Sequence, residues 1–288
     1  METLIRQSKP EDLPCLHNIW QEVFSSPDED LFFDYFYKAD NCIVAETGDV
    51  VCAMGFILPV GHFVYENTSY PCAMIYALAT SHKFRKNGIA STIVSELVSQ
   101  GRKAGYPITI LCPSPDEVFQ YYSSKTEFRE SFYINEKVFS NPSKSSANTV
   151  LSVLSAQDYM NLRNQKLLGT PHIKLELHAV EYQKKLSRLT GGELYMLEGN
   201  GWTGIAAVEK LSGTEVLIKE LLCPGEHESD TISAIASAFP SHKITARTPV
   251  VPGHSSHGSI RRFAMMASSL SIFDDAKLKS AWYGFAFD

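Results

Sequence analysis

The chain has 288 residues, of which 44% are hydrophobic and 20% are charged, and its formal net charge is -6. This composition is that of a globular protein long enough for two domains, not of a disordered or fibrous one. The acidic balance disfavours nucleic-acid binding, which requires a basic surface, and no apolar run approaches the ~20 residues of a membrane-spanning helix.

The N-terminal part of the sequence predicts a strand, two helices and a β-hairpin. METLIRQSKPEDL lacks the apolar core of a secretion signal, so we expect a cytoplasmic protein. Ser8, Pro10 and Glu11 form a capping-box pattern, which predicts that Ser8 is the N-cap of the first helix. The predicted elements are, in order, a strand at 3–6, a helix through 13–23, a helix in 30–39 and strands at 42–46 and 50–58.

A long strand follows at Ser69–Thr80, and its residues are apolar on both faces. Such a strand is typical of the centre of a sheet. The next helix reaches about Ala104, where Gly105-Tyr106-Pro107 stops it. Beyond it the sequence predicts a strand at 108–112, a short helix at 115–124 and a pair of strands in 128–139.

Residues 140–149 (SNPSKSSANT) are small, polar and proline-containing, which is typical of a linker. We therefore predict one domain at 1–139 and a second at 150–288. Beyond the linker, a helix, a β-hairpin, a strand, a helix and a strand recur in the same order as before. This repetition predicts an internal structural duplication.

The turn after the central strand carries Arg85-Lys86-Asn87-Gly88-Ile89-Ala90 directly before a helical pattern. A helix N-terminus exposes unpaired N–H groups and the positive end of the helix dipole, so this turn suits an anion such as phosphate. A surface helix cap with solvated cations is the alternative. The turn matches neither GxxxxGK[ST] nor GxGxxG, which disfavours a P-loop or a Rossmann dinucleotide site. The six cysteines show no metal-ligand spacing, so we expect no metal.

Arg85-x-x-Gly88-x-Ala90, at this junction in this order of elements, resembles the acyl-CoA signature Q/R-x-x-G-x-G/A of the GNAT (Gcn5-related N-acetyltransferase) family. The resemblance implies the GNAT fold, an α/β fold with a central mixed, mostly antiparallel sheet, and acetyl-CoA as co-substrate. It also implies that the main chain of the central strand aligns the pantetheine arm, while the turn binds the pyrophosphate. The implied cofactor-binding residues are Leu78, Ala79, Thr80, Arg85, Lys86, Asn87, Gly88, Ile89, Ala90 and Ser91.

The family places a tyrosine on the helix after the next strand, where its hydroxyl protonates the leaving CoA thiolate. In DEVFQYYSSKTEF the resemblance assigns this catalytic role to Tyr122, with Tyr121 as the alternative. Glu127 stands where the family has glycine, and the spacing from the tyrosine to Phe128 is one residue longer. Because a helix with adjacent tyrosines buries at most one of them against the core, one of the two is a packing residue.

The C-terminal sequence, Trp282 to Asp288 (WYGFAFD), resembles the ends of multi-domain GNAT proteins of the Eis type. In those proteins the terminal carboxylate assists proton transfer, which implies Asp288 as a second catalytic residue; a plain C-terminal strand is the alternative. The second domain has Cys223-Pro224-Gly225-Glu226 where the signature is expected. We therefore predict a GNAT-like half that lacks the CoA motif.

The function implied by the resemblance is an acetyl-CoA-dependent N-acetyltransferase. It would act on a primary amine of a small molecule by direct transfer through a ternary complex, with no nucleic-acid or membrane partner. The alternative is a non-catalytic acyl-CoA-binding sensor or interaction protein on the same fold, which the departure at Glu127 favours. A different acyl group and a homo-oligomer are both compatible with the sequence.

Overall fold

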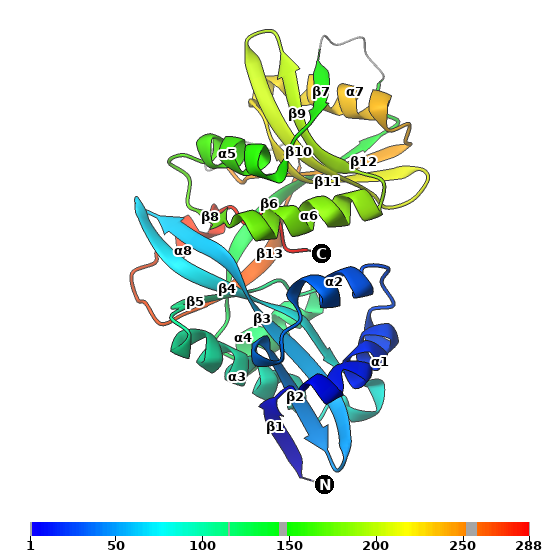
Figure 1. The fold of residues 1–288 in the computed structure, drawn as a ribbon. Helices are drawn as coiled ribbons and strands as arrows, with labels where there is room; N and C mark the ends of the chain where they lie inside the picture. The colour runs from blue at the N-terminus through cyan, green and yellow to red at the C-terminus, as the bar shows by residue number, and fades with distance from the viewer. Residues whose placement is uncertain (1, 115, 144–148, 252–257, 288) are drawn as a thin grey trace. The chain divides into compact units, whose positions relative to one another are not determined.

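The computed structural model describes residues 2–114, 116–143, 149–251 and 258–287, and the chain folds into two compact units (Figure 1). Unit 1 comprises Met1–Phe63, Ser69–Ser131 and Ala264–Phe273. Unit 2 comprises Val64–Thr68, Phe132–Phe263 and Asp274–Asp288. The units are therefore interleaved along the chain, and they differ from the predicted contiguous ranges 1–139 and 150–288 at 64–68, 132–139 and 264–273.

Unit 1 is built around a mixed sheet in the order β1-β2-β3-β4-β5-β13. The pairs β1/β2, β2/β3 and β5/β13 are antiparallel, whereas β4/β5 is parallel. This is the mixed, mostly antiparallel sheet that the sequence predicted. Its elements are β1 (Thr3–Gln7), α1 (Leu13–Val23), α2 (Glu29–Phe36), β2 (Cys42–Thr47), β3 (Val50–Tyr65), β4 (Thr68–Thr80), α3 (Ile89–Lys103), β5 (Ile108–Leu111), α4 (Glu117–Lys125) and β13 (Ser259–Ser268).

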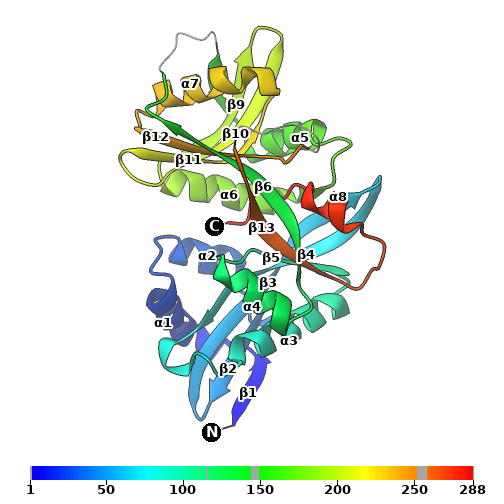
Figure 2. The same ribbon diagram turned by 180° about the vertical axis from the view of Figure 1, so that it is seen from behind.

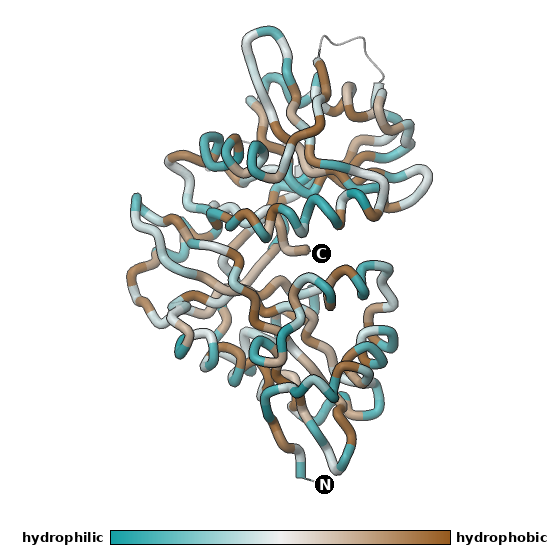
Figure 3. Tube along the Cα trace, viewed as in Figure 1, coloured by the Kyte–Doolittle hydropathy of each residue, from teal (hydrophilic) through white to brown (hydrophobic). Residues whose placement is uncertain are grey.

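Helices cover both faces of this sheet because its central strands are apolar on both sides. The hydrophobic stretches of unit 1 accordingly follow its strands (Figure 3). On one face Ile57 of β3 joins the core that α3 and α4 share. On the other face Phe56 contacts Phe32 of α2, with ring centroids 4.9 Å apart. A Cβ added to Gly55 would lie 2.9 Å from a methyl carbon of Leu97, so this glycine lets α3 approach β3 closely.

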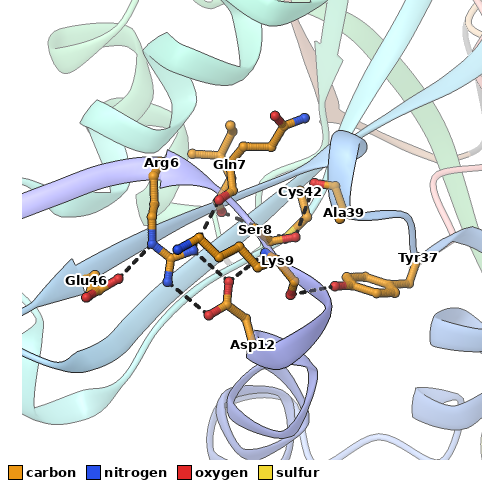
Figure 4. A network of polar contacts seen from close by, with 10 residues as sticks. Arg6, Gln7, Ser8, Lys9, Asp12, Tyr37, Ala39, Cys42 and Glu46 are labelled. Carbon is orange, nitrogen blue, oxygen red and sulfur yellow. Dashed lines mark hydrogen bonds and ion pairs between the residues drawn. The ribbon is translucent and has the colours of Figure 1, made fainter.

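A polar network fixes the start of α1 against β1 and β2 (Figure 4). Arg6 binds both carboxylate oxygens of Asp12, at 2.7 and 2.9 Å, and its Nε donates to Glu46 at 2.7 Å. Asp12 also accepts from the backbone N–H of Lys9 at 2.7 Å. The predicted capping role of Ser8 is wrong: the N-cap of the first helical turn, Pro10–Asp12, is Lys9, and the Ser8 N–H donates to the Cys42 carbonyl at 2.9 Å. The hydrogen bond from Arg6 lowers the pKa of Asp12.

Unit 2 repeats the strand order of unit 1. Its sheet runs β6-β12-β11-β10-β9-β7, and β11/β12 is parallel while the pairs β9/β10, β10/β11 and β7/β9 are antiparallel. This confirms the predicted second GNAT-like half. Its elements are β6 (Arg129–Ser140), β7 (Val150–Val153), α5 (Ala156–Lys166), β8 (His172–Leu175), α6 (Leu177–Leu189), β9 (Glu193–Gly199), β10 (Trp202–Lys210), β11 (Glu215–Leu222), α7 (Glu228–Ala238), β12 (Lys243–Thr248) and α8 (Asp275–Lys279).

The strand pair predicted in 128–139 is a single long strand, β6. RESFYINEKVFS contains neither glycine nor proline, so nothing in it turns the chain back into a hairpin. The antiparallel neighbour of β5 is instead β13, which the sequence did not predict (Figure 2).

A buried ion pair organises the interior of unit 2. Arg163 of α5 and Glu220 of β11 are both 0% exposed, and Nε lies 2.9 Å from the carboxylate. Arg163 also donates to the backbone carbonyl of Tyr283 at 2.8 Å, and the indole of Trp282 donates to Glu220. Because every charge is matched by hydrogen bonds, the pair holds the segment 282–283 inside the unit. Within the residues described, no helix is long and apolar enough to cross a membrane.

Candidate functional site

The central feature of the candidate site is the end of β4 in unit 1. β4 pairs with β5 only from Cys72 to Ile75, opposite Ile108 to Leu111. β5 ends there, whereas β4 continues to Thr80. Ala77 in this continuation has φ +48°, which is uncommon for a residue other than glycine and interrupts the regular strand. The last five residues of β4 therefore extend past the end of β5.

The backbone groups of Leu78 and Thr80 point toward the edge of β4 along which β5 runs earlier in the strand, beyond the point where β5 ends. Ser81 donates its N–H to the Cys52 carbonyl of β3 at 2.9 Å. Because alternate residues of a strand direct their backbone groups to opposite edges, those of Thr80 and Leu78 face away from β3. The hydroxyl oxygen of Thr80 is buried and has no hydrogen-bond partner among the described residues. This orphaned hydroxyl fits a ligand that lies along β4.

The turn after β4 leads into α3 through a glycine in the left-handed conformation. Gly88 is the N-cap residue of α3, with φ +75° and ψ 0°, and no side chain caps the helix. The hydroxyls of Ser91 and Thr92 donate to the Gly88 carbonyl at 2.7 and 3.3 Å, so they do not occupy the first N–H groups of the helix. A Cβ added to Gly88 would meet no atom within 4 Å. The helix start is therefore open to an anion, as the predicted pyrophosphate position requires.

The predicted cationic residues lie on the surface at this helix start. Arg85, Lys86 and Asn87 are exposed, and Arg85 donates from Nε to the Thr80 carbonyl at 3.0 Å. Asn87 donates to the Phe84 carbonyl at 3.2 Å. Ile89 is buried in the core of unit 1, so only its backbone is available to a ligand. The structure thus brings the predicted turn residues together around one uncapped helix terminus.

Sequence reasoning missed Glu22, which fixes the beginning of this turn. Its carboxylate accepts from the backbone N–H of His82 at 2.7 Å and from the Ser81 hydroxyl at 3.1 Å. The first of these bonds lowers the pKa of Glu22. Glu22 lies on α1, 59 residues from Ser81, so no local pattern in the sequence reveals this contact.

The two predicted tyrosines lie side by side on α4. Tyr122 is buried within the hydrophobic core of unit 1, whereas Tyr121 is half-buried against the same core. Their rings meet edge to face with centroids 5.3 Å apart. Burial raises the pKa of Tyr122, so its hydroxyl stays protonated at neutral pH. A protonated hydroxyl is the form that a general acid requires.

Glu127, the residue that departs from the family pattern, lies on the surface just after α4. It is exposed and forms an ion pair with Arg102 of α3. Phe128 beside it is buried in the core. The substitution of glycine by glutamate is therefore accommodated by a surface ion pair.

The corresponding turn of unit 2 differs from that of unit 1. Helix α7 begins at Glu228 after His227, and its first turn carries Glu228 and Asp230. Acidic side chains at a helix N-terminus repel phosphate, which agrees with the predicted absence of a CoA motif in this half. Asp288, the second predicted catalytic residue, lies outside the described residues. In the part of the chain that the structure describes, no cluster of three or more histidine, cysteine or acidic residues could hold a metal.

Comparison with known families finds a match to the N-terminal part of the chain. Residues 4–139 match the model of the acetyltransferase (GNAT) domain. These residues form a GNAT acetyltransferase domain. Curated protein sequences provide no match to the chain.

Solved GNAT structures share the fold over nearly the whole chain. A GCN5-related N-acetyltransferase from Anabaena variabilis is similar with a TM-score of 0.70 at 15% identity, over 92% of this chain and 72% of that one. Eis1 from Mycobacterium abscessus gives a TM-score of 0.64 at 9% identity, over 93% and 73% of the two chains. A putative acetyltransferase from Pyrococcus horikoshii gives 0.58 at 15% identity, over 95% and 92%. The resemblance to the two-domain GNAT proteins therefore extends through both halves of the chain.

Proposed function

We propose that this protein transfers an acetyl group from acetyl-CoA to a primary amine of a small molecule. The observation that supports the proposal is the end of β4. There the backbone groups of Leu78 and Thr80 face away from β3, beyond the end of β5, and the chain then turns into the uncapped start of α3 at Gly88. An extended thioester with a pyrophosphate at one end matches this succession of a strand edge and a helix N-terminus.

In this proposal the residues have separate roles. Backbone N–H groups of β4 bind the thioester oxygen, on which negative charge develops as the amine attacks. The carbon–sulfur bond breaks as the carbon–nitrogen bond forms, and the Tyr122 hydroxyl gives its proton to the departing thiolate. The amine gives up a proton to solvent, which returns one to Tyr122, so the products are the N-acetylated amine and the free thiol of CoA. The transfer is direct, within a ternary complex.

A second candidate is an acyl-CoA-binding protein without catalysis. It is favoured by the burial of Tyr122 in the hydrophobic core, which is also the position of an ordinary packing residue. This candidate retains the helix start at Gly88 and needs no function of the tyrosine hydroxyl.

Thiol release separates the two candidates. The full-length protein is incubated with acetyl-CoA and a panel of primary amines, polyamines, aminoglycosides and amino acids, and free CoA thiol is titrated. The proposed enzyme releases thiol with at least one amine and not with buffer alone. Calorimetric binding of acetyl-CoA without release for any amine would support the non-catalytic candidate, and absence of binding would reject both.

A further inference from the structure

The turn between β4 and α3 is anchored by a carboxylate on α1. We propose that Glu22 is a positioning residue of the acetyl-CoA site, which holds the backbone at Ser81 and His82 and thereby the helix start at Gly88. This role rests on the proposed function, since it presupposes that the pyrophosphate of acetyl-CoA binds at the turn.

Three groups of the turn meet one oxygen of Glu22. Oε1 accepts from the backbone N–H of His82 at 2.7 Å and from the Ser81 hydroxyl at 3.1 Å, and Nδ1 of His82 lies 3.2 Å from it. His82 begins the short 3-10 helix His82–Phe84, and the side chain of Ser81 does not cap this helix. The first N–H groups of a helix have no partner within the helix. Glu22 therefore supplies from another element the cap that the turn itself lacks.

The rest of the turn needs such an anchor because its backbone is strained. Lys86 has φ +66° and Gly88 has φ +75°, so both are left-handed. For a residue other than glycine this conformation is costly, and it persists only where the surroundings enforce it. A bond within the turn, such as that from the Phe84 N–H to the Ser81 carbonyl at 2.9 Å, moves with the turn. The bonds to Glu22 instead fix the turn to α1.

α1 is a rigid support for this carboxylate. Leu16 and Trp20 on its inner face are buried in unit 1. Gln21, the neighbour of Glu22, donates to Glu29 of α2. A side chain positions its partner only as well as its own element is held. Removal of the Glu22 carboxylate should therefore free the beginning of the turn while α1 stays in place.

The charge of Glu22 opposes a direct contact with the cofactor. The bond from the His82 N–H and, to a smaller extent, the charge of Arg85 lower the pKa of Glu22, so it is ionised at neutral pH. An ionised carboxylate repels phosphate. Its contribution must then come from its role as a hydrogen-bond acceptor. Glutamine retains a carbonyl oxygen that can accept both bonds and lacks the charge, so it separates the two effects.

The test compares three variants of the full-length protein by titration calorimetry with acetyl-CoA. We expect Glu22→Ala to raise the Kd about tenfold and Glu22→Gln to raise it no more than about twofold. Glu96→Ala is the matched control, because it removes one negative charge from an exposed position farther along α3, and its Kd should equal that of the wild type. Since Glu22 is also exposed, all three variants should fold, which circular dichroism checks.

A truncated donor shows whether the effect acts at the pyrophosphate. S-acetylpantetheine has the thioester and the pantetheine arm of acetyl-CoA but no pyrophosphate. With an amine that promotes thiol release, Glu22→Ala should raise the KM for acetyl-CoA about tenfold with kcat within about twofold. Its kcat/KM for S-acetylpantetheine should stay within about twofold of the wild type.

The outcomes separate failure of this role from failure of the proposed function. A wild-type protein that binds acetyl-CoA no more tightly than Glu22→Ala would overturn the role of Glu22 alone. The same holds if Glu22→Gln binds as weakly as Glu22→Ala, or if both donors lose kcat/KM equally. A large fall in kcat for Glu22→Gln would make Glu22 a catalytic residue instead. A wild-type protein that does not bind acetyl-CoA at all would reject the proposed function and this role with it.

Discussion

The Nε atom of Arg85 donates a hydrogen bond to the backbone carbonyl of Thr80 at 3.0 Å. Arg85, which we propose as a phosphate ligand, is thereby tied to the last residue of β4. A guanidinium has five donors, so this bond leaves others for phosphate oxygens.

Replacement of Arg85 is expected to weaken the binding of acetyl-CoA. Arg85→Gln removes both the charge and the Nε donor, and we expect a Kd about tenfold higher, equivalent to about 1.4 kcal/mol. Arg85→Lys keeps the charge but cannot reproduce the fork of donors, so its effect should be intermediate. Titration calorimetry with acetyl-CoA measures both, and an unchanged Kd for Arg85→Gln would exclude Arg85 from the binding site.

Gly88 gives the sharpest test of the helix start. Gly88→Leu places a side chain in open space where the pyrophosphate is proposed to bind, and the left-handed φ costs about 1–2 kcal/mol. We expect acetyl-CoA binding to be lost while the fold persists, as circular dichroism would show. Gly105→Leu is the matched control, because Gly105 also has a positive φ and open space but lies beyond the other end of α3. If both variants bound acetyl-CoA with equal affinity, the anion site at Gly88 would be refuted.

Substitution by phenylalanine, which removes only the hydroxyl group, tests which of Tyr122 and Tyr121 is the general acid. Tyr122→Phe keeps the buried ring and its packing, so stability should change little, while loss of the general acid is expected to lower kcat about a hundredfold. The KM for acetyl-CoA should stay near that of the wild type. Tyr121→Phe should leave kcat within about twofold, because its hydroxyl has no part in the proposed transfer. The opposite ranking of the two variants would assign the acid to Tyr121.

The ion pair of Arg6 and Asp12 predicts a pH-dependent contribution to stability. Because the pKa of Asp12 is lowered in the folded state, its contribution is present above the ordinary aspartate pKa and is lost as the pH falls through the folded value. We expect Asp12→Asn to reduce the free energy of unfolding by about 2 kcal/mol at pH 7, and by progressively less below about pH 4. Urea unfolding of the two proteins across this range measures the difference. Asp34→Asn, at an exposed position on α2, serves as the control and should show no such trend.

The sequence predicted the elements that have strong local signals. The apolar strand before the turn, the glycine at the start of α3 and the helix with paired tyrosines are all present. Hydrophobic periodicity and the choice of residues at a helix start depend on neighbours in the chain, so one sequence suffices to identify them.

The features that the sequence did not predict depend on distant residues. Nothing near Ser259–Ser268 indicates that this strand pairs with β5, since the partner residues lie about 150 positions earlier. Likewise, Ser8 and Glu11 form a capping-box pattern, yet the Ser8 N–H is bound to the Cys42 carbonyl and the N-cap is the next residue, Lys9. Tertiary pairing outweighs the local preference at both positions.

The most direct test of the central claim is the balance of products from acetyl-CoA. After incubation with an amine that promotes thiol release, the free CoA thiol and the acetylated amine are quantified together by thiol titration and mass spectrometry. We predict equal amounts of both, formed only when the amine is present and strongly reduced in Tyr122→Phe. Thiol released without an acetylated amine, or at an equal rate when no amine is added, would contradict direct acetyl transfer to an amine.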